Sequence, residues 1–212
     1  MKKLVFAACL FAVAAVCAES TPVMLSLLDP VQVPSRDYDV TGFRLSLLYG
    51  RCNGFKGLDI GIVGRTDGEF TGLQIGGVNK VDDRFLGGQV GLVNWSSSEV
   101  REWDKVSTGA QIGGFNYAGS FCGLQEGLVN FTGDRFTGLQ SGLVNVTENL
   151  YGVQCGFYFI FGVNVASGMV RGCQIGLVNY AEEMDSGIQI GLVNLISQNG
   201  WLPVCPIVNG RF

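Results

Sequence analysis

The amino-acid sequence predicts an all-β protein made of short repeats, and three observations lead to that prediction. A phrase of the form Gly-x-Gln-x-Gly-x-Val-Asn recurs along most of the chain, with clear copies at residues 72–79 and 187–194. Within the phrase, apolar residues alternate with small or polar ones, which is the period of a β-strand. Glycine supplies 32 of the 212 residues. Two glycines in each short segment exclude a helix, because each costs about 1 kcal/mol there relative to alanine.

Residues 1–18 are typical of a secretory signal peptide. A basic start at residues 1–3 precedes an apolar stretch at residues 4–16, and Val16, Cys17 and Ala18 suit a cleavage site. The apolar stretch is shorter than the roughly 20 residues of a membrane-spanning helix. A lipoprotein leader, in which Cys17 would be acylated, is the open alternative. We therefore expect export to the periplasm, outer membrane or cell surface of a Gram-negative bacterium.

Residues 19–41 form a non-repeating segment that precedes the repeat domain. This segment contains Pro22, Pro30 and Pro34, three of the five prolines. The apolar run at residues 23–28 is expected to form one strand, and the rest is expected to be extended.

Residues 42–212 form the predicted repeat domain, with about eleven units of about 15 residues. We number each unit by the residue at its glutamine position, here called the Gln slot. The Gln slots hold Arg44, Asp59, Gln74, Gln89, Gln111, Gln125, Gln140, Gln154, Gln174, Gln189 and Val204. The first and last units are degenerate, as expected at the ends of a stacked array.

Two insertions interrupt the period, and each falls between Gln slots. The insertion at residues 95–105 is polar and contains Trp95 and Trp103, two of the three tryptophans. The second insertion contains the aromatic run at residues 157–161. Loop extensions are tolerated at such positions and often carry function.

Each unit is predicted to be one short β-hairpin, with an outgoing arm, a turn after the asparagine and a returning arm. In this interpretation Leu73 and Ile75 provide burial, the glutamines bond laterally to each other, and the asparagines serve the turns. The predicted structural repeat residues are Gln74, Gln89, Gln111, Gln125, Gln140, Gln154, Gln174, Gln189, Asn79, Asn94, Asn116, Asn130, Asn145, Asn179 and Asn194.

Three arrangements of the units are compatible with this pattern. The first interpretation is radial closure into a shallow barrel, because a lone hairpin is marginal in water and must pack against neighbours. The alternatives are an open β-solenoid and an up-and-down outer-membrane barrel. The last would have an odd number of strands, whereas bacterial single-chain barrels have an even number.

The repeats of the form Gly-Leu-Gln-Ile-Gly-Leu-Val-Asn resemble a family of bacterial surface-repeat proteins, over about residues 42–212. The resemblance implies an exported protein with the shallow, petalled barrel called a β-flower. It implies no settled activity and no catalytic residues. Arg44, Asp59 and Val204 depart from the family pattern at the Gln slot, and the two insertions break its strict symmetry.

The composition argues against several kinds of chemistry. The chain has no histidine and a net charge of −4 without a basic stripe, so neither a histidine base nor a nucleic-acid partner is expected. The absence of a Cys-x-x-Cys pair gives no support to zinc. No metal or other cofactor is expected. The cysteines beyond the leader are interpreted as small apolar residues of undetermined pairing: Cys52, Cys122, Cys155, Cys173 and Cys205.

These observations predict a non-enzymatic envelope protein that acts as a scaffold or binding module. Its apolar leucine and isoleucine face is expected to form the core or to rest on lipid, so membrane lipid or another envelope component is the expected partner. One alternative is an integral outer-membrane barrel or pore. The other is a secreted carbohydrate-binding module or enzyme that uses Trp95 and Trp103. The identity of any glycan or small-molecule ligand stays open.

Overall fold

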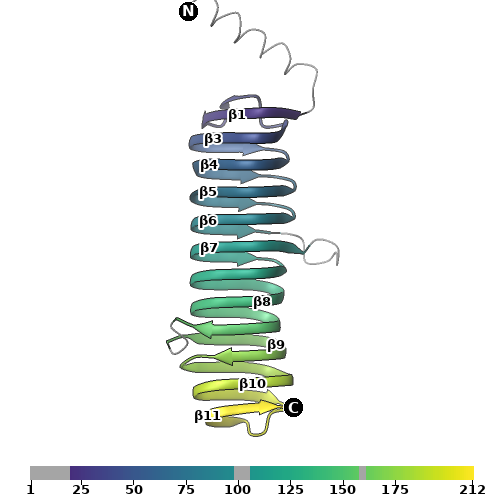
Figure 1. Ribbon diagram of the computed structural model, residues 1–212, viewed down its shortest axis with the longest axis vertical. Helices are drawn as coiled ribbons and strands as arrows, with labels where there is room; N and C mark the ends of the chain where they lie inside the picture. Colours follow the sequence, from purple (N-terminus) through teal and green to yellow (C-terminus); the bar gives the residue numbers. More distant parts are fainter. Residues whose placement is uncertain (1–19, 98–105, 158–160) are drawn as a thin grey trace, which may run out of the picture.

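The computed structural model describes residues 20–97, 106–157 and 161–212, and all regular structure in them is β-strand. The chain winds into an open column of stacked coils, a β-solenoid, with β1 at one end and the C-terminus at the other (Figure 1). The all-β prediction and the solenoid alternative are therefore confirmed. Among the described residues, no helix is long and apolar enough to cross a membrane.

One eleven-stranded sheet follows the chain through the column, in the order β11-β10-β9-β8-β7-β6-β5-β4-β3-β1-β2. The strands are β1 Ser20–Leu28, β2 Val31–Val33, β3 Asp39–Cys52, β4 Phe55–Thr66, β5 Phe70–Val81, β6 Phe85–Ser96, β7 Ser107–Ala118, β8 Phe121–Gly156, β9 Val163–Ile175, β10 Val178–Gln198 and β11 Val204–Arg211. β8 is long because it runs through the Gln slots of residues 125, 140 and 154 without a break.

Each repeat forms one coil, and β5 illustrates its shape. The buried side chains of β5 are those of Phe70, Gln74, Asn79 and Val81. The coil reverses direction at two places. One is a glycine bend after the Gln slot, where Gly77 is left out of the pairing with β6; the other is a polar turn that begins at Asp82, three residues after Asn79, so the predicted place of the asparagine in the turn is wrong. Each repeat therefore runs out and back, as expected of a hairpin arm pair.

The hydrogen bonds of the two arms go to the next coil and not to each other. β5 and β6 pair in parallel and in register, so that Gln74 lies beside Gln89 and Asn79 beside Asn94. The other neighbouring coils pair in the same way. The radially closed barrel and the up-and-down barrel are both wrong. In-register parallel stacking is favoured over barrel closure because it places identical side chains above one another, where they can form hydrogen bonds.

Both ends of the column are covered by an antiparallel strand. β2 pairs antiparallel with β1, and β11 pairs antiparallel with β10. The expected eleventh unit is therefore wrong: Val204 lies beside Leu195, and Asn209 lies beside Gln189. Covering strands at the ends protect a sheet from pairing with another chain, since open strand edges promote aggregation.

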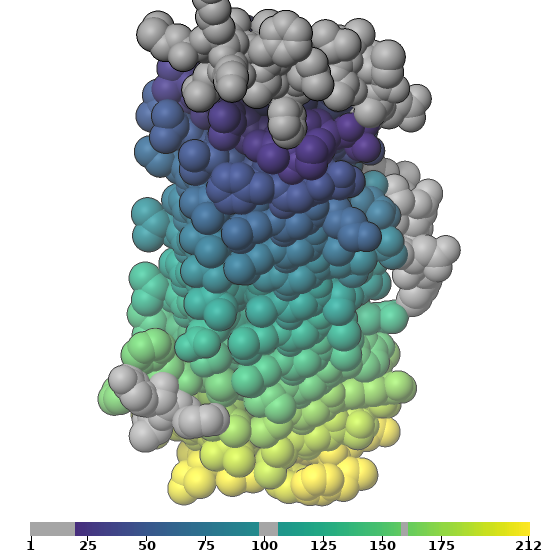
Figure 2. All heavy atoms as spheres, turned by 45° about the horizontal axis from the view of Figure 1, so that its top comes forward, coloured from purple at the N-terminus to yellow at the C-terminus, as the bar shows by residue number. Residues whose placement is uncertain are grey.

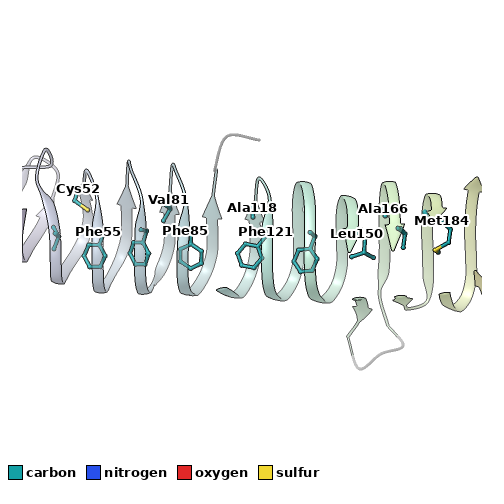
Figure 3. Packing of buried hydrophobic residues seen from close by; sticks show 14 of the residues in the cluster. Cys52, Phe55, Val81, Phe85, Ala118, Phe121, Leu150, Ala166 and Met184 are labelled. Carbon is teal, nitrogen blue, oxygen red and sulfur yellow. The ribbon is translucent and has the colours of Figure 1, made fainter. Parts of the chain in front are cut away.

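The hydrophobic core consists of two rows that run along the column (Figure 3). One row is aromatic over much of its length, with ring centroids 5.0 Å apart between Phe55 and Phe70 and 6.2 Å apart between Phe121 and Phe136. Leu150 continues this row. The other row holds smaller side chains, and its labelled members in Figure 3 are Cys52, Val81, Ala118 and Ala166.

Candidate functional site: an apolar edge opposite a charged edge

The Gln-slot side chains form one continuous hydrogen-bonded ladder inside the column. All eight glutamines are fully buried. The Nε2 of each, from Gln89 to Gln189, donates to Oε1 of the glutamine in the preceding coil at 2.7–3.0 Å. Burial of an amide is costly unless it is hydrogen-bonded, and the ladder meets that requirement up to its C-terminal end, where the Oε1 of Gln189 has no partner. The predicted lateral bonding is present, with the glutamines on the inside.

The ladder ends on a buried ion pair that occupies the first two Gln slots. Gln74 Nε2 donates to Asp59 Oδ2 at 2.9 Å, and Asp59 also accepts two hydrogen bonds from Arg44, at 2.6 and 2.7 Å. Gly64 leaves room for this pair, since a Cβ there would lie 2.5 Å from Asp59 Oδ2. Burial alone would lower the pKa of Arg44, but the Asp59 carboxylate outweighs it, so the pKa is raised.

A second ladder, of asparagines, runs in the opposite direction. Asn79 Nδ2 donates to Asn94 Oδ1 in the following coil at 2.8 Å, and six further bonds of 2.7–2.9 Å continue to Asn194. Because the glutamines donate toward the N-terminal end and the asparagines toward the C-terminal end, the two rows of amide dipoles oppose each other. Asn164 belongs to this ladder and was missed in the sequence, although Gly162-Val163-Asn164 restates the end of the phrase after the insertion.

The leucine and isoleucine face does not form the core. The side chains of Leu73 and Ile75 point outward and are 39% and 38% exposed, while that of Gln74 between them is fully buried. Leu92 and Leu192 are 74% and 66% exposed. The expected burial of these residues is therefore wrong. The narrow interior is already filled by the two amide ladders and the two core rows.

The outward apolar side chains gather around the glycine bend. They occupy the positions one before and one, three and four after the Gln slot, and we call this strip the apolar edge. Its large exposed members are Leu47, Ile60, Ile62, Leu73, Ile75, Val78, Val90, Leu92, Ile112, Leu128, Leu139, Leu143, Phe157, Val163, Leu177, Ile190 and Leu192. Among the described residues at these positions, Glu126 is the one charged side chain.

Charged residues gather at the polar turn on the other side of the coil, and we call this strip the charged edge. Near the N-terminal end, Arg65 bonds to Asp67 at 2.9 Å and to Asp82 at 2.7 Å, and Lys80 contacts Asp82 at 3.1 Å. Arg171 and Asp185, 2.6 Å apart, form a further exposed pair near the C-terminal end, on the strand segments that lead to the next Gln slots. Each exposed pair adds little stability, but together they keep this side of the column hydrated.

Aromatic side chains continue the outward row that Arg65 and Lys80 begin, six residues after the Gln slot. The Trp95 and Tyr117 rings stack with centroids 3.9 Å apart, and Phe131 stacks on Tyr117 at 5.6 Å. On the other arm of the coil, Arg135 lies 5.2 Å above the ring of Tyr151. One face of Trp95 is thus covered by Tyr117. Trp103, the second predicted binding tryptophan, lies outside the described residues.

The aromatic insertion begins on the apolar edge. Phe157 lies at the same position of its coil as Leu92 and Leu192, three residues after the Gln slot. It pairs with Phe161 across an isolated antiparallel bridge, and the two side chains are 43% and 62% exposed. Residues 158–160 lie outside the described part of the chain.

Titratable side chains do not form a metal-ligand cluster in the part of the chain that the structure describes. Among the described residues, no three His, Cys, Asp or Glu side chains converge as metal ligands. Burial raises the pKa of the Cys52 thiol, with Arg44 opposing the shift, so the thiol is protonated near neutral pH. All five cysteines in the described chain are free. The described face in Figure 2 is a dense stack of side chains.

A groove of about 420 Å³ extends the apolar edge at its N-terminal end. It is lined mainly by Leu25, Leu27, Val31, Val33, Leu45 and Leu47. Leu25 pairs with Leu45 of the first coil, so the strand β1 continues the apolar positions of the column by one further layer.

The chain matches no protein-family model, no curated protein and no solved structure. The class to which it belongs is therefore defined by its own geometry: a β-solenoid with a polar, hydrogen-bonded interior and an apolar outer edge. Membership of the surface-repeat family stays a prediction.

Proposed function

We propose that this protein is a non-enzymatic, exported envelope protein. Its solenoid serves as a rigid scaffold, and its apolar edge serves as the surface by which it is held in the envelope. The observation that carries the proposal is the exposure of leucine at the same position in coil after coil, at Leu92, Leu128 and Leu192. Monomeric soluble proteins rarely expose large continuous apolar strips unless the strip contacts a partner or a membrane.

The inward-facing residues support a structural role for the repeats. The glutamines and asparagines are fully buried and bond mainly to one another and to the backbone, so they offer nothing to a substrate. The pore alternative depends on a barrel, whereas the coil interiors here are filled by side chains. The carbohydrate-binding alternative loses part of its basis because Trp95 stacks on Tyr117.

Fractionation of cells tests this proposal. The chain is expressed with its own leader in a Gram-negative host, in a Cys17→Ala background so that acylation cannot hold the protein in the envelope. We expect the protein in the envelope fraction, resistant to high-salt extraction. The triple variant Leu92→Glu/Leu128→Glu/Leu192→Glu is expected to move to the soluble periplasmic fraction.

The matched control is Leu202→Glu, which changes an equally apolar side chain that is 53% exposed but lies in the loop before β11. It is expected to stay in the envelope. Circular dichroism on all variants confirms folding, and little loss is expected because each replaced side chain is largely exposed. Recovery of the Cys17→Ala protein in the soluble fraction would overturn the proposal.

A further inference from the structure

We propose that the partner of the apolar edge is the surface of a phospholipid bilayer. The column lies along the membrane, with the apolar edge among the acyl chains and the charged edge in water. This inference rests on the proposed function, because it names what the attachment surface contacts.

The shape of the apolar edge fits a plane and not a pocket ligand. Coils stack at the strand spacing of about 4.8 Å, so the ten coils extend the edge over roughly 45 Å. Every coil contributes at least one outward apolar side chain, from Leu47 at one end to Leu192 at the other, although Gly77 and Gly114 occupy the position of Leu92 in two of the coils. A long, narrow strip of this kind suits an extended apolar surface.

The chemistry of the apolar edge also favours lipid over a folded partner. At its positions, the described residues offer one charge, Glu126, and one hydroxyl, Ser141. Interfaces between folded proteins carry about one hydrogen bond per 100–200 Å². An edge with so few donors and acceptors cannot supply that density. The acyl region of a bilayer requires none.

The outward position that follows the apolar edge also suits a membrane interface. Six residues after the Gln slot, the side chains change along the column from Arg65 and Lys80 to Trp95, Tyr117 and Phe131, each beside the next. Tryptophan and tyrosine concentrate at the boundary between acyl chains and water, because one part of the ring system is apolar and the other is polar.

The aromatic pair Phe157 and Phe161 extends the apolar edge at one coil. These side chains leave the coil at its most exposed apolar position and add two phenyl rings beyond the regular repeat. A flat second copy would need a hollow at the matching place. Fluid acyl chains adapt to such a protrusion, which therefore suits insertion into lipid.

Vesicle flotation tests the inference directly. The exported, processed Cys17→Ala protein is mixed with phosphatidylcholine vesicles and centrifuged through a density gradient. We expect the protein to float with the vesicles. The bound fraction should not fall in 1 M salt, where the Debye length is about 3 Å, and should not rise with anionic lipid, because the apolar edge carries no cations. The Leu92→Glu/Leu128→Glu/Leu192→Glu variant should bind at least tenfold more weakly, and Phe157→Glu/Phe161→Glu should also bind more weakly. Leu202→Glu should bind as the parent does.

Three results would overturn the inference. If the parent stays in the envelope of cells but does not float with vesicles, the proposed function survives and the lipid partner does not. If the parent is a dimer by analytical ultracentrifugation, does not float, and becomes monomeric in the triple variant, the apolar edge joins two copies. If Leu202→Glu loses binding as the triple variant does, the contact is not specific to the edge.

Discussion

At the scale of single residues, the interior of this protein depends on polar side chains that satisfy each other. A glutamine in a strand is usually expected to face solvent, yet Gln125 has no exposed surface and bonds to Gln111 and Gln140 at 2.7 Å. Stacking in register removes the usual cost of a buried amide, because each new coil supplies a donor and an acceptor at the same depth. The same geometry stacks the phenyl rings of the core.

The ion pair at the start of the glutamine ladder yields the sharpest prediction at this scale. Asp59→Asn leaves the Arg44 guanidinium buried without its carboxylate, which should cost about 3–5 kcal/mol. The double variant Arg44→Gln/Asp59→Gln removes both charges and extends the ladder by two members. It should recover most of that loss. Denaturant unfolding of the wild type, Asp59→Asn and the double variant measures the difference.

A double variant no more stable than Asp59→Asn would contradict this account. It would mean that other bonds of Arg44, to the Arg65 carbonyl and to Cys52 Sγ at 2.9 Å each, matter more than the charge pair. The exposed pair of Arg171 and Asp185 serves as the comparison, and removing it should change stability by less than about 1 kcal/mol.

At the scale of the coil, the first glycine of each unit determines how closely neighbouring coils approach. Gly123 has a φ of +139°, and a Cβ on it would lie 2.0 Å from the carbonyl oxygen of Gly109 in the preceding coil. Both the backbone conformation and the contact exclude a side chain. The repeated glycine is therefore required by the stacking itself.

Replacing this glycine by alanine should destabilise the protein more than the same replacement at a glycine outside the stacking contact. We expect Gly123→Ala to lower stability by more than about 2 kcal/mol, since strain and a backbone clash add. Gly133→Ala is the control, because its nearest neighbour would be 3.6 Å from the new Cβ. It should be neutral or slightly stabilising. Midpoints of denaturant unfolding compare the two, and equal effects would refute the role assigned to Gly123.

At the scale of the whole molecule, the open column separates features that a closed ring would bring together. A ring of hairpins would place the N-terminal and C-terminal units side by side. Here β2 and β11 cover opposite ends of the sheet. Stacking also turns the separation of apolar and charged side chains within each coil into two strips that run along the column.

A distance measurement distinguishes the two architectures in solution. Spin labels attached through bio-orthogonal amino acids at Val31 and Ile207, both largely exposed, should lie roughly 55 Å apart, from the strand spacing and the number of layers between them. Pulsed electron spin resonance measures this range. A short distance, below about 25 Å, would indicate that the chain closes on itself.

Much of this architecture could be predicted from local patterns in the sequence. The strand class, the period and the positions of the insertions follow from alternation and glycine spacing, and the Gln slots from Arg44 to Gln189 are in register as numbered. The prediction that Val204 occupies an eleventh Gln slot is wrong because the covering strand β11 runs antiparallel. The degenerate sequence of this unit does not indicate the direction of its strand. The candidate site is predicted less well, because the sequence points to Trp95 and Trp103 as binding residues and leaves open whether the apolar leucine and isoleucine face forms the core or rests on lipid.

Local patterns in the chain establish that this protein is an all-β array of repeats, because the period of two and the recurring glycines are properties of neighbouring residues. Which face of each strand turns inward depends on how the coils stack. A period-two pattern has two faces, and nothing local says which of Gln74 or Leu73 is buried. Stacking in register decided it, because it lets buried amides bond along the column. Leucine was therefore placed outside, where it forms the edge that we propose meets lipid.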